Sequence, residues 1–196
     1  KERYKRKFCE ISSKAPEWVD YESTSSNAEI VAGLEHVLYW GNDGQHLARR
    51  QGLGAWGKRG VAVSQMSSLP CCMYLGGAFD SNMTAIVPRD ERVFRALFNY
   101  AVSGQLSRDV REFDHSIKPT NSSFEKVSFD SSHWESEGQF AADDDIPLPY
   151  SDVPSQWIFH GHPTPASSTL VVAVARLLGY RWPAENGSDM GLADAA

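Results

Sequence analysis

The sequence predicts an α+β fold, in which a small antiparallel sheet with packed helices is followed by a C-terminal helical appendage. Short strand-like runs separated by turn residues occupy the first half of the chain, and a strongly amphipathic helix directly follows them. A second apolar helical pattern comes only after a stretch rich in Asp and Pro. We therefore expect a main domain over residues 1–134, and an acidic, Pro-rich linker with a helical segment over residues 135–196.

The expected sheet lies in the N-terminal half. Apolar residues between positions 27 and 40 fall at helical spacing, although residues 36–40 fit a short strand equally well. Residues 61–66, which begin with alternating apolar positions, and residues 71–75 are each expected to form a strand, and a turn rich in Gly, Asp and Asn leads to a third strand over residues 83–87.

Helical patterns follow the sheet. Asp90 offers an N-cap oxygen to a helix that stops at Gly104. Its apolar stripe consists of Val93, Phe94, Leu97, Phe98 and Ala101. Ser107 is expected to cap a second helix that runs to Phe113, and residues 124–129 return to a strand-like pattern.

The last helix is expected between Ser168 and Gly179, after a break marked by Asp and Pro residues from position 143 to position 154. One face of this helix is apolar and consists of Leu170, Val171, Val174, Leu177 and Leu178. Such a face requires a partner surface.

Composition limits the classes of function. The formal net charge of −6 argues against generic nucleic-acid binding, but residues 1–126 hold 17 Lys and Arg against 15 Asp and Glu, whereas residues 127–196 hold 2 against 10. The three cysteines give no disulfide framework and fit core positions in a reducing compartment. The sequence has no secretory leader and no run of about 18 apolar residues, so we expect a cytoplasmic protein that does not enter a membrane. Because the chain begins without Met, we treat it as a piece of a longer polypeptide.

A basic window is the first candidate for a nucleic-acid contact. Residues 44–79 contain Arg49, Arg50, Lys58 and Arg59 and no Asp or Glu. Glycines surround these cations, and glycine lets backbone N–H groups approach a phosphate closely. The alternative is a solvated loop with a few surface charges.

Polar residues near this window supply candidates for reading bases. Lys and Arg position a protein on phosphates, while Gln, Asn and Ser can read base edges in the major groove. The expected phosphate contacts are Arg49, Arg50, Lys58, Arg59, Lys118 and Lys126. The expected base contacts are Ser64, Gln65, Ser67, Ser68 and Asn121.

Catalytic and metal signatures are weak. His160 and His162 together with Asp143, Asp144 and Asp145 could serve a metal-dependent nuclease, but their spacing matches no closed zinc pattern and no Glu-x-Lys motif follows the acidic triplet. The sequence contains no nucleophile-elbow, phosphate-loop or dinucleotide-binding motif. We expect no metal, no cofactor and no enzymatic activity in this chain alone.

Several segments, taken in order, resemble a known family. They are residues 38–44 (Leu-Tyr-Trp-Gly-Asn-Asp-Gly), 54–66 (Gly-Ala-Trp-Gly-Lys-Arg-Gly-Val-Ala-Val-Ser-Gln-Met), 79–82 (Phe-Asp-Ser-Asn), 85–88 (Ala-Ile-Val-Pro) and 118–121 (Lys-Pro-Thr-Asn). They resemble the target-recognition region of large adenine-N6 DNA methyltransferases, those of BREX phage defence and of fused type IIG or IIL restriction-modification enzymes. Residues 146–150 through 175–183 are similar to the segment that follows in such proteins.

The resemblance implies a division of labour. The family's catalytic Asn/Asp-Pro-Pro-Tyr/Phe signature is missing from this sequence, as is a glycine-rich loop for S-adenosylmethionine. Methylation and S-adenosylmethionine binding would therefore belong to the methyltransferase core of the parent polypeptide. In that parent an adenine is flipped out of double-stranded DNA while this region selects the sequence.

A second hypothesis is a protein-interaction module, in which the apolar helix faces around Phe98 and Leu177 dock on the methyltransferase core or on a partner subunit. Both hypotheses can hold for one chain. The acidic C-terminal part favours packing on protein, because its carboxylates would be repelled by DNA.

Overall fold

The computed structural model describes residues 4–11, 15–24, 29–66, 68–164 and 168–187. The fold is α+β, as the sequence predicts. The chain forms two compact units, each assembled from discontinuous segments. The first unit comprises Lys1–Tyr21, Gly33–Arg50 and Tyr150–Ala196, and the second comprises Glu22–Ala32 and Gln51–Pro149. Residues 135–149, expected to join the C-terminal segment, thus lie in the second unit.

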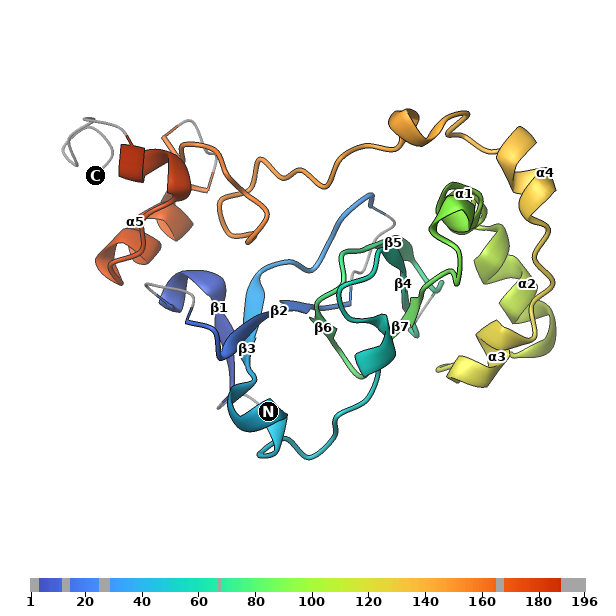
Figure 1. The fold of residues 1–196 in the computed structure, drawn as a ribbon, viewed down its shortest axis with the longest axis horizontal. Coiled ribbons are helices and arrows are strands. Elements are labelled where there is room, and N and C mark those ends of the chain that lie inside the picture. Colours follow the sequence, from blue (N-terminus) through green and yellow to red (C-terminus); the bar gives the residue numbers. More distant parts are fainter. Residues whose placement is uncertain (1–3, 12–14, 25–28, 67, 165–167, 188–196) are drawn as a thin grey trace. The chain divides into compact units, whose positions relative to one another are not determined.

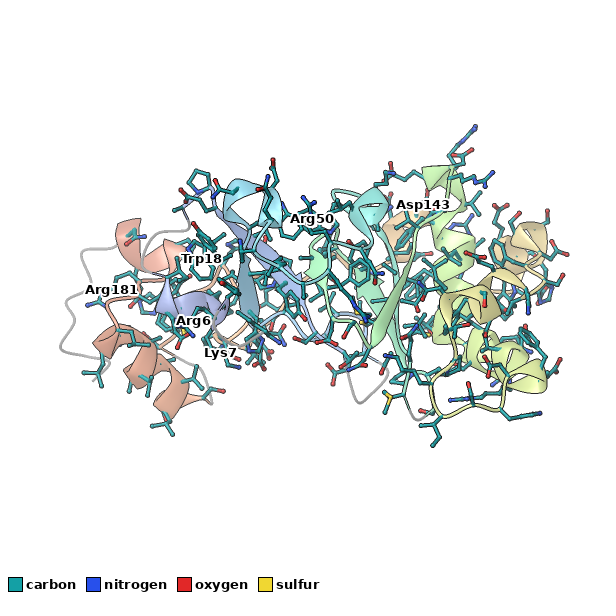
Figure 2. All side chains as sticks on the ribbon, turned by 90° about the horizontal axis from the view of Figure 1, so that it is seen from below. Arg6, Lys7, Trp18, Arg50, Asp143 and Arg181 are labelled. Carbon is teal, nitrogen blue, oxygen red and sulfur yellow. The ribbon has the colours of Figure 1, made fainter. Side chains whose placement is uncertain are left out.

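The first unit contains a small antiparallel sheet. Strand β3 (His36–Tyr39) lies between β1 (Lys5–Lys7) and β2 (Trp18–Glu22), and Val37 faces Arg6 on one side and Asp20 on the other. Of the helix and the short strand that the sequence allowed for residues 36–40, the structure has the strand, over residues 36–39. The exposed Arg6 and Lys7 project from the edge strand β1 (Figure 2).

The C-terminal segment adds a small apolar core to the first unit. Helix α5 (Thr169–Leu177) ends before Gly179, as expected, and the short η6 (Pro183–Gly187) follows. Val172 and Ala175 of α5 are buried with Phe159 and Trp182. The indole of Trp182 is fully buried, and its Nε1–H donates to the carbonyl oxygen of Pro154 at 3.2 Å. The hydrogen bond allows this large amphipathic ring to lie in the core.

The sheet of the second unit has the order β5-β4-β7 and is antiparallel throughout. Strands β4 (Gly60–Ser64), β5 (Cys71–Tyr74) and β7 (Met83–Ile86) match the three predicted strands, and each is one residue shorter than predicted. A short strand, β6 (Ala78–Phe79), precedes β7. Position 60 requires glycine, because a Cβ there would lie 2.4 Å from the carbonyl oxygen of Ile86.

Both faces of β4 are covered. Val61 and Val63 pack into the main core with Phe98, whereas Ala62 faces a second cluster that includes Cys72. Burial raises the pKa of the Cys72 thiol to about 12, and that of the Cys71 thiol to the same value, so both behave as small apolar side chains at neutral pH.

Four helices lie to one side of this sheet in Figure 1. They are α1 (Phe94–Val102), preceded by η4 (Glu91–Val93), α2 (Gln105–Phe113), α3 (Asn121–Glu125) and α4 (Ser131–Ser136). The Asp90 carboxylate accepts a hydrogen bond from the Arg92 N–H at 3.1 Å, so the predicted N-cap is confirmed. Of these helices, α1 packs against β4 and β5.

Two local predictions were wrong. Gly104, at φ 77°, is the residue that precedes α2, while the Ser107 hydroxyl donates to the carbonyl oxygen of Leu69 at 2.9 Å. Gly104 adopts this left-handed conformation without the steric cost a Cβ would add. Residues 124–129 do not form a strand: Phe124 lies in α3, where it is 8% exposed and packs into the main core.

Asn99 explains why residues beyond 134 belong to the second unit. This buried residue of α1 donates from Nδ2 to the carbonyl oxygens of Trp134 (3.1 Å) and Phe140 (3.0 Å), and its Oδ1 accepts from the Phe140 N–H (2.9 Å). Phe140 and Ile146 are buried in the same core. The first part of the expected linker, up to Ile146, therefore packs in the same core as α1.

The acidic triplet forms the short η5 (Asp143–Asp145). The Asp143 carboxylate, labelled in Figure 2, is 3.0 Å from Nε of Arg95, and Asp145 accepts from the Ala142 N–H at 2.7 Å. Within the residues described, no helix combines the length and apolar character that crossing a membrane requires.

Candidate nucleic-acid interface

The six cations expected to contact phosphate are all exposed, but they belong to different units. The boundary after Arg50 places Arg49 and Arg50 in the first unit. The other four, Lys58, Arg59, Lys118 and Lys126, belong to the second unit. The basic window of the sequence is therefore divided, and the second unit holds the larger share.

The glycine-rich loop uses part of its backbone internally. The Gly57 N–H donates to the carbonyl oxygen of Gly76 at 3.0 Å, and the Lys58 N–H donates to that of Ala55 at 3.2 Å. The Lys58 ammonium reaches back to the carbonyl oxygen of Gly54 at 2.7 Å. These two amides are committed to the fold and cannot also bind a phosphate.

Arg59 is positioned by an aromatic ring. Its guanidinium carbon lies 4.1 Å from the centre of the Phe94 ring, an arrangement typical of a cation–π contact. Glu91 approaches the guanidinium at 3.9 Å, but both side chains are solvent-exposed, so this ion pair is weak. The guanidinium is therefore held in place and remains open to solvent.

The structure brings three predicted site residues, Gln65, Lys118 and Asn121, into one hydrogen-bonded cluster. Asn82 and Thr84 complete this cluster, and we call the five residues the polar rim. Nε2 of Gln65 donates to Oγ1 of Thr84 (2.8 Å) and to Oδ1 of Asn121 (3.0 Å), and the Thr84 hydroxyl donates to the same Oδ1 (2.9 Å). The Gln65 N–H donates to the carbonyl oxygen of Asn82 at 2.8 Å. Lys118 donates to Oδ1 of Asn82 at 2.7 Å.

The rim combines a buried part and an exposed part. Gln65 and Thr84 are 5% and 7% exposed, whereas Lys118 and Asn121 are exposed. Both hydrogen bonds to the Asn121 amide go to its oxygen. This fixes the direction of the amide and leaves its NH₂ group as the end that can donate to a ligand.

The remaining predicted base contacts lie in different environments. Ser64 is 6% exposed within β4, and Ser68 is exposed. Ser67 lies outside the described residues. A base contact by Ser64 or Gln65 would require movement of the groups that cover them, whereas Ser68 and Asn121 require none.

The Asp114 carboxylate is hydrogen-bonded to helix α3. The Asp114 carboxylate accepts from the N–H and hydroxyl of Ser116 (3.0 and 2.5 Å) and from the hydroxyl of Ser123. These hydrogen bonds lower the pKa of Asp114 to about 2, so the group is charged at neutral pH. It fixes the position of the helix that begins at Asn121.

The residues suggested for a metal are divided between the two units, with Asp143–Asp145 in the second and His160 and His162 in the first. Among the described residues, His, Cys, Asp and Glu form no group of three or more that could hold a metal ion. Nδ1 of His162 lies 2.6 Å from the Thr164 hydroxyl. His160 instead lines a cavity in the first unit.

That cavity was not predicted. It has a volume of about 410 Å³ and is lined by nine residues, namely Phe8, Ile11, Asp20, Val37, Trp157, Phe159, His160, Tyr180 and Pro183. The clustering of aromatic residues at 157–160 was the available signal, but the other walls come from distant parts of the chain, which periodicity cannot bring together.

Comparison with known proteins gives no assignment: no protein-family model matches the chain, and no curated protein matches it.

Proposed function

We propose that this chain is a sequence-specific DNA target-recognition region of an adenine-specific (N6) DNA methyltransferase that acts in restriction-modification or phage defence. The proposal joins the resemblance of the sequence segments to the geometry of the second unit. The chain selects the sequence of double-stranded DNA in the cytoplasm, and the methyltransferase core of the parent binds S-adenosylmethionine and transfers the methyl group.

The polar rim is the observation that carries the proposal. Gln65, Lys118 and Asn121 were selected from the sequence for phosphate or base contacts, and they come from segments more than 50 positions apart, as the 56-residue separation of Gln65 and Asn121 records. Lys118 and Asn121 are both exposed and close in sequence, and the two hydrogen bonds to the Asn121 amide leave its NH₂ group unused. A cation that positions the backbone next to an amide that reads a base edge is the combination that sequence-specific binding requires.

Each residue has a distinct part in this proposal. Lys58, Arg59, Lys118 and Lys126 bind phosphates of one site, and Arg49 and Arg50 contribute further phosphate contacts from their own unit. Asn121 and Ser68 contact base edges. Gln65 holds the Asn121 amide in its orientation and does not itself need to reach the base.

Binding to a random-sequence duplex pool across a salt series tests the proposal. Lys118→Ala should weaken binding to all sequences alike and lower the slope of log affinity against log salt by about one unit, because one phosphate contact is lost. Asn121→Ala should leave that slope unchanged and relax preference at one base position, at a cost of about 1 to 3 kcal/mol.

Arg92→Ala is the matched control, because Arg92 is an exposed cation of the same unit that is paired with Asp90 and lies outside the rim. It should change neither slope nor preference. A folded wild-type chain that binds no duplex at low salt, or variants of Lys118 and Asn121 that behave like Arg92→Ala, would contradict the proposal.

The second candidate function is a protein-interaction module that docks on the methyltransferase core or a partner subunit. Helix α5 favours it, because the apolar face expected to need a partner is the exposed one: Leu170 is 76% exposed, Val174 46% and Leu177 87%. Exposed apolar residues gathered on one helix mark contact surfaces. The corresponding face around Phe98 is buried within the second unit.

A further inference from the structure

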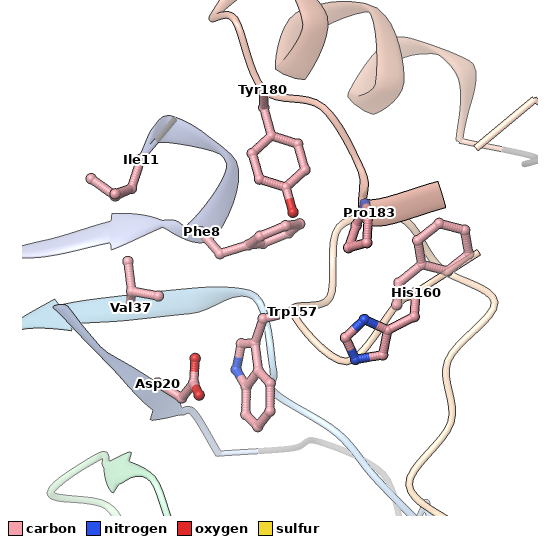
Figure 3. A pocket seen from close by; sticks show the side chains of 9 residues that line it. Phe8, Ile11, Asp20, Val37, Trp157, His160, Tyr180 and Pro183 are labelled. Carbon is pink, nitrogen blue, oxygen red and sulfur yellow. The ribbon is translucent and has the colours of Figure 1, made fainter. Parts of the chain in front are cut away.

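The cavity of the first unit is bounded by aromatic rings from distant segments of the chain. Four aromatic side chains and an exposed histidine line it, namely Phe8, Trp157, Phe159, Tyr180 and His160 (Figure 3). The volume of about 410 Å³ falls within the range of small-molecule sites, about 300 to 1,000 Å³. Because aromatic rings pack best against other flat rings, these walls favour a flat ligand.

The walls are held in place by contacts within the first unit. The Trp157 backbone N–H donates to the carbonyl oxygen of Leu34 at 2.8 Å, and the Tyr180 N–H donates to that of Ala175 at 3.0 Å. The rings of Phe8 and Tyr180 meet edge to face, with centroids 5.0 Å apart and planes at 86°. A ligand therefore enters walls that are already ordered, which lowers the entropic cost of binding.

Trp157 brings a hydrogen-bond donor that the fold leaves unused. Its indole Nε1 is buried and has no hydrogen-bond partner among the described residues. In Figure 3 the nitrogen edge of the indole is turned toward the side of the cavity that Asp20 lines. An unpaired buried N–H is unfavourable, and an indole N–H can only donate, so a ligand acceptor on this side of the cavity would satisfy it.

The other polar groups of the cavity add no need for a ligand donor. The Asp20 carboxylate already has an interaction partner within the chain. The Tyr180 hydroxyl points into the cavity in Figure 3, and burial raises its pKa, so this hydroxyl keeps its proton and can donate. Trp157 and Tyr180 thus both favour a ligand that accepts hydrogen bonds.

These walls disfavour three ligand classes. A purely apolar ring would leave the Trp157 N–H unpaired, and a quaternary ammonium has no acceptor to offer it. The nine described lining residues include no Lys or Arg, so a carboxylate or a phosphate would lack a cation in the walls. A flat, uncharged ring that carries a hydrogen-bond acceptor fits best.

We propose that this cavity binds a small, uncharged heteroaromatic molecule, whose ring packs among the aromatic walls and whose ring nitrogen or carbonyl oxygen accepts a hydrogen bond from Trp157. Because the described walls offer no Lys or Arg to a phosphate backbone, the occupant is a free molecule and not a base of a nucleic-acid strand. The inference goes beyond DNA recognition and does not rest on it, since the polar rim belongs to the other unit.

Titration of the whole chain with quinoline and with naphthalene, followed by calorimetry and ligand-observed NMR, tests the proposal. The two bicyclic rings have nearly the same size, but only quinoline has an acceptor nitrogen. Quinoline should bind more tightly by about fivefold, the equivalent of one neutral hydrogen bond. Trp157→Phe removes the N–H and keeps an aromatic ring, so it should make the two affinities equal. Equal affinities in the wild type, or an unchanged difference in the variant, would overturn the proposal.

Trp18→Phe is the matched control, because Trp18 is a half-buried tryptophan of the same unit that does not line the cavity. It should retain the preference for quinoline. If Trp157→Phe failed to fold, the nitrogen–proton NMR spectrum of the wild type would still decide. Quinoline should move the Trp157 indole N–H resonance downfield, as a hydrogen-bond acceptor does, and naphthalene should not. The same response to both rings would count against the hydrogen bond.

The competing occupants have their own probes. Choline represents a quaternary ammonium, and naphthoate represents an ionised ring of similar shape; tighter binding of either than of quinoline would overturn the uncharged class. Displacement of quinoline by a single-stranded oligonucleotide would make a nucleic-acid base the occupant and overturn the free molecule. Absence of binding by quinoline at millimolar concentration would refute the site itself. Quinoline binding that persists in rim variants without duplex binding would show that the two proposals are independent.

Discussion

The buried Gln65 amide holds two other side chains of the polar rim, Thr84 and Asn121, by hydrogen bonds. The side chain is almost fully buried, and one nitrogen serves acceptors on β7 and at the start of α3. Because a buried amide that loses its partners is costly, this residue is expected to hold Asn121 and Thr84 in one arrangement.

Gln65→Met keeps the length of the side chain and removes both hydrogen bonds. We expect the free energy of unfolding to fall by about 1 to 3 kcal/mol, since Thr84 and Asn121 are left partly unsatisfied. Denaturant unfolding followed by circular dichroism measures it. Ser68→Ala, an exposed substitution in the same segment, should change the free energy by less than about 0.5 kcal/mol, and an equal loss in both variants would contradict the role given to Gln65.

His36 makes stability depend on pH. Burial lowers the pKa of its imidazole from 6.5 to about 4, and Lys5 and Lys7 add to the effect. The unfolded chain therefore binds a proton more readily than the folded chain between these two values, so this contribution is complete above pH 6.5 and is lost as the pH falls toward 4.

Replacement of His36 by Gln should flatten this dependence. We expect the wild type to lose more stability than His36→Gln when the pH is lowered from 7 to 4.5 in urea unfolding experiments. His115→Gln, which changes an exposed histidine, should retain the wild-type dependence. Parallel curves for wild type and His36→Gln would rule out this histidine as the source.

At the scale of the element, hydrogen bonds from Asn99 link helix α1 to α4 and to the segment that follows it. Asn99→Ala removes three hydrogen bonds, and we expect the free energy of unfolding to fall by roughly 3 kcal/mol, about 1 kcal/mol for each bond. Thermal and denaturant unfolding measure the loss, and Asn186→Ala at an exposed position serves as the control. A loss below about 0.5 kcal/mol would mean that Phe140 and Ile146 hold the segment without it.

Periodicity predicted some elements of the second unit and misassigned others. The strands β4, β5 and β7 and helix α1 have long apolar patterns with clear turn and cap residues at their ends. Residues 124–129 carry only three apolar side chains, and burial of Phe124 from a helix satisfies that pattern as well as a strand would. Short patterns leave the choice to tertiary packing.

At the scale of the whole molecule, helix α5 distributes its apolar residues over two surfaces. Val172 and Ala175 complete the core of the first unit, while Leu170 and Leu177 remain exposed. The helix therefore has enough apolar side chains for its own core and for a further contact.

A double substitution, Leu170→Lys with Leu177→Lys, tests the proposal that the exposed apolar face of α5 docks on another protein. We expect the free energy of unfolding to change by less than about 0.5 kcal/mol per site, since both side chains are exposed. Association with the methyltransferase core, measured by calorimetry with the separately produced core, should be lost. Duplex binding should persist, because the proposed phosphate contacts of the rim belong to the second unit and α5 belongs to the first. Unchanged association would assign the contact to another surface.

The sequence by itself determined the α+β class, the three strands of the second unit, the α1 helix with its Asp90 cap and the helix that ends before Gly179. These features depend on neighbours within a few positions, so local pattern suffices for them. It also marked Gln65, Lys118 and Asn121 as candidates by residue type, and their contact with DNA stays a prediction.

Only the tertiary structure decided which distant segments share a unit, that Gln65 is buried behind Asn121, and that Phe8, Asp20, Trp157 and Tyr180 enclose a cavity. The physical reason is that packing and hydrogen bonding between residues far apart in the chain depend on the fold as a whole. A pattern read along one sequence contains the period of each element but not the pairing between them.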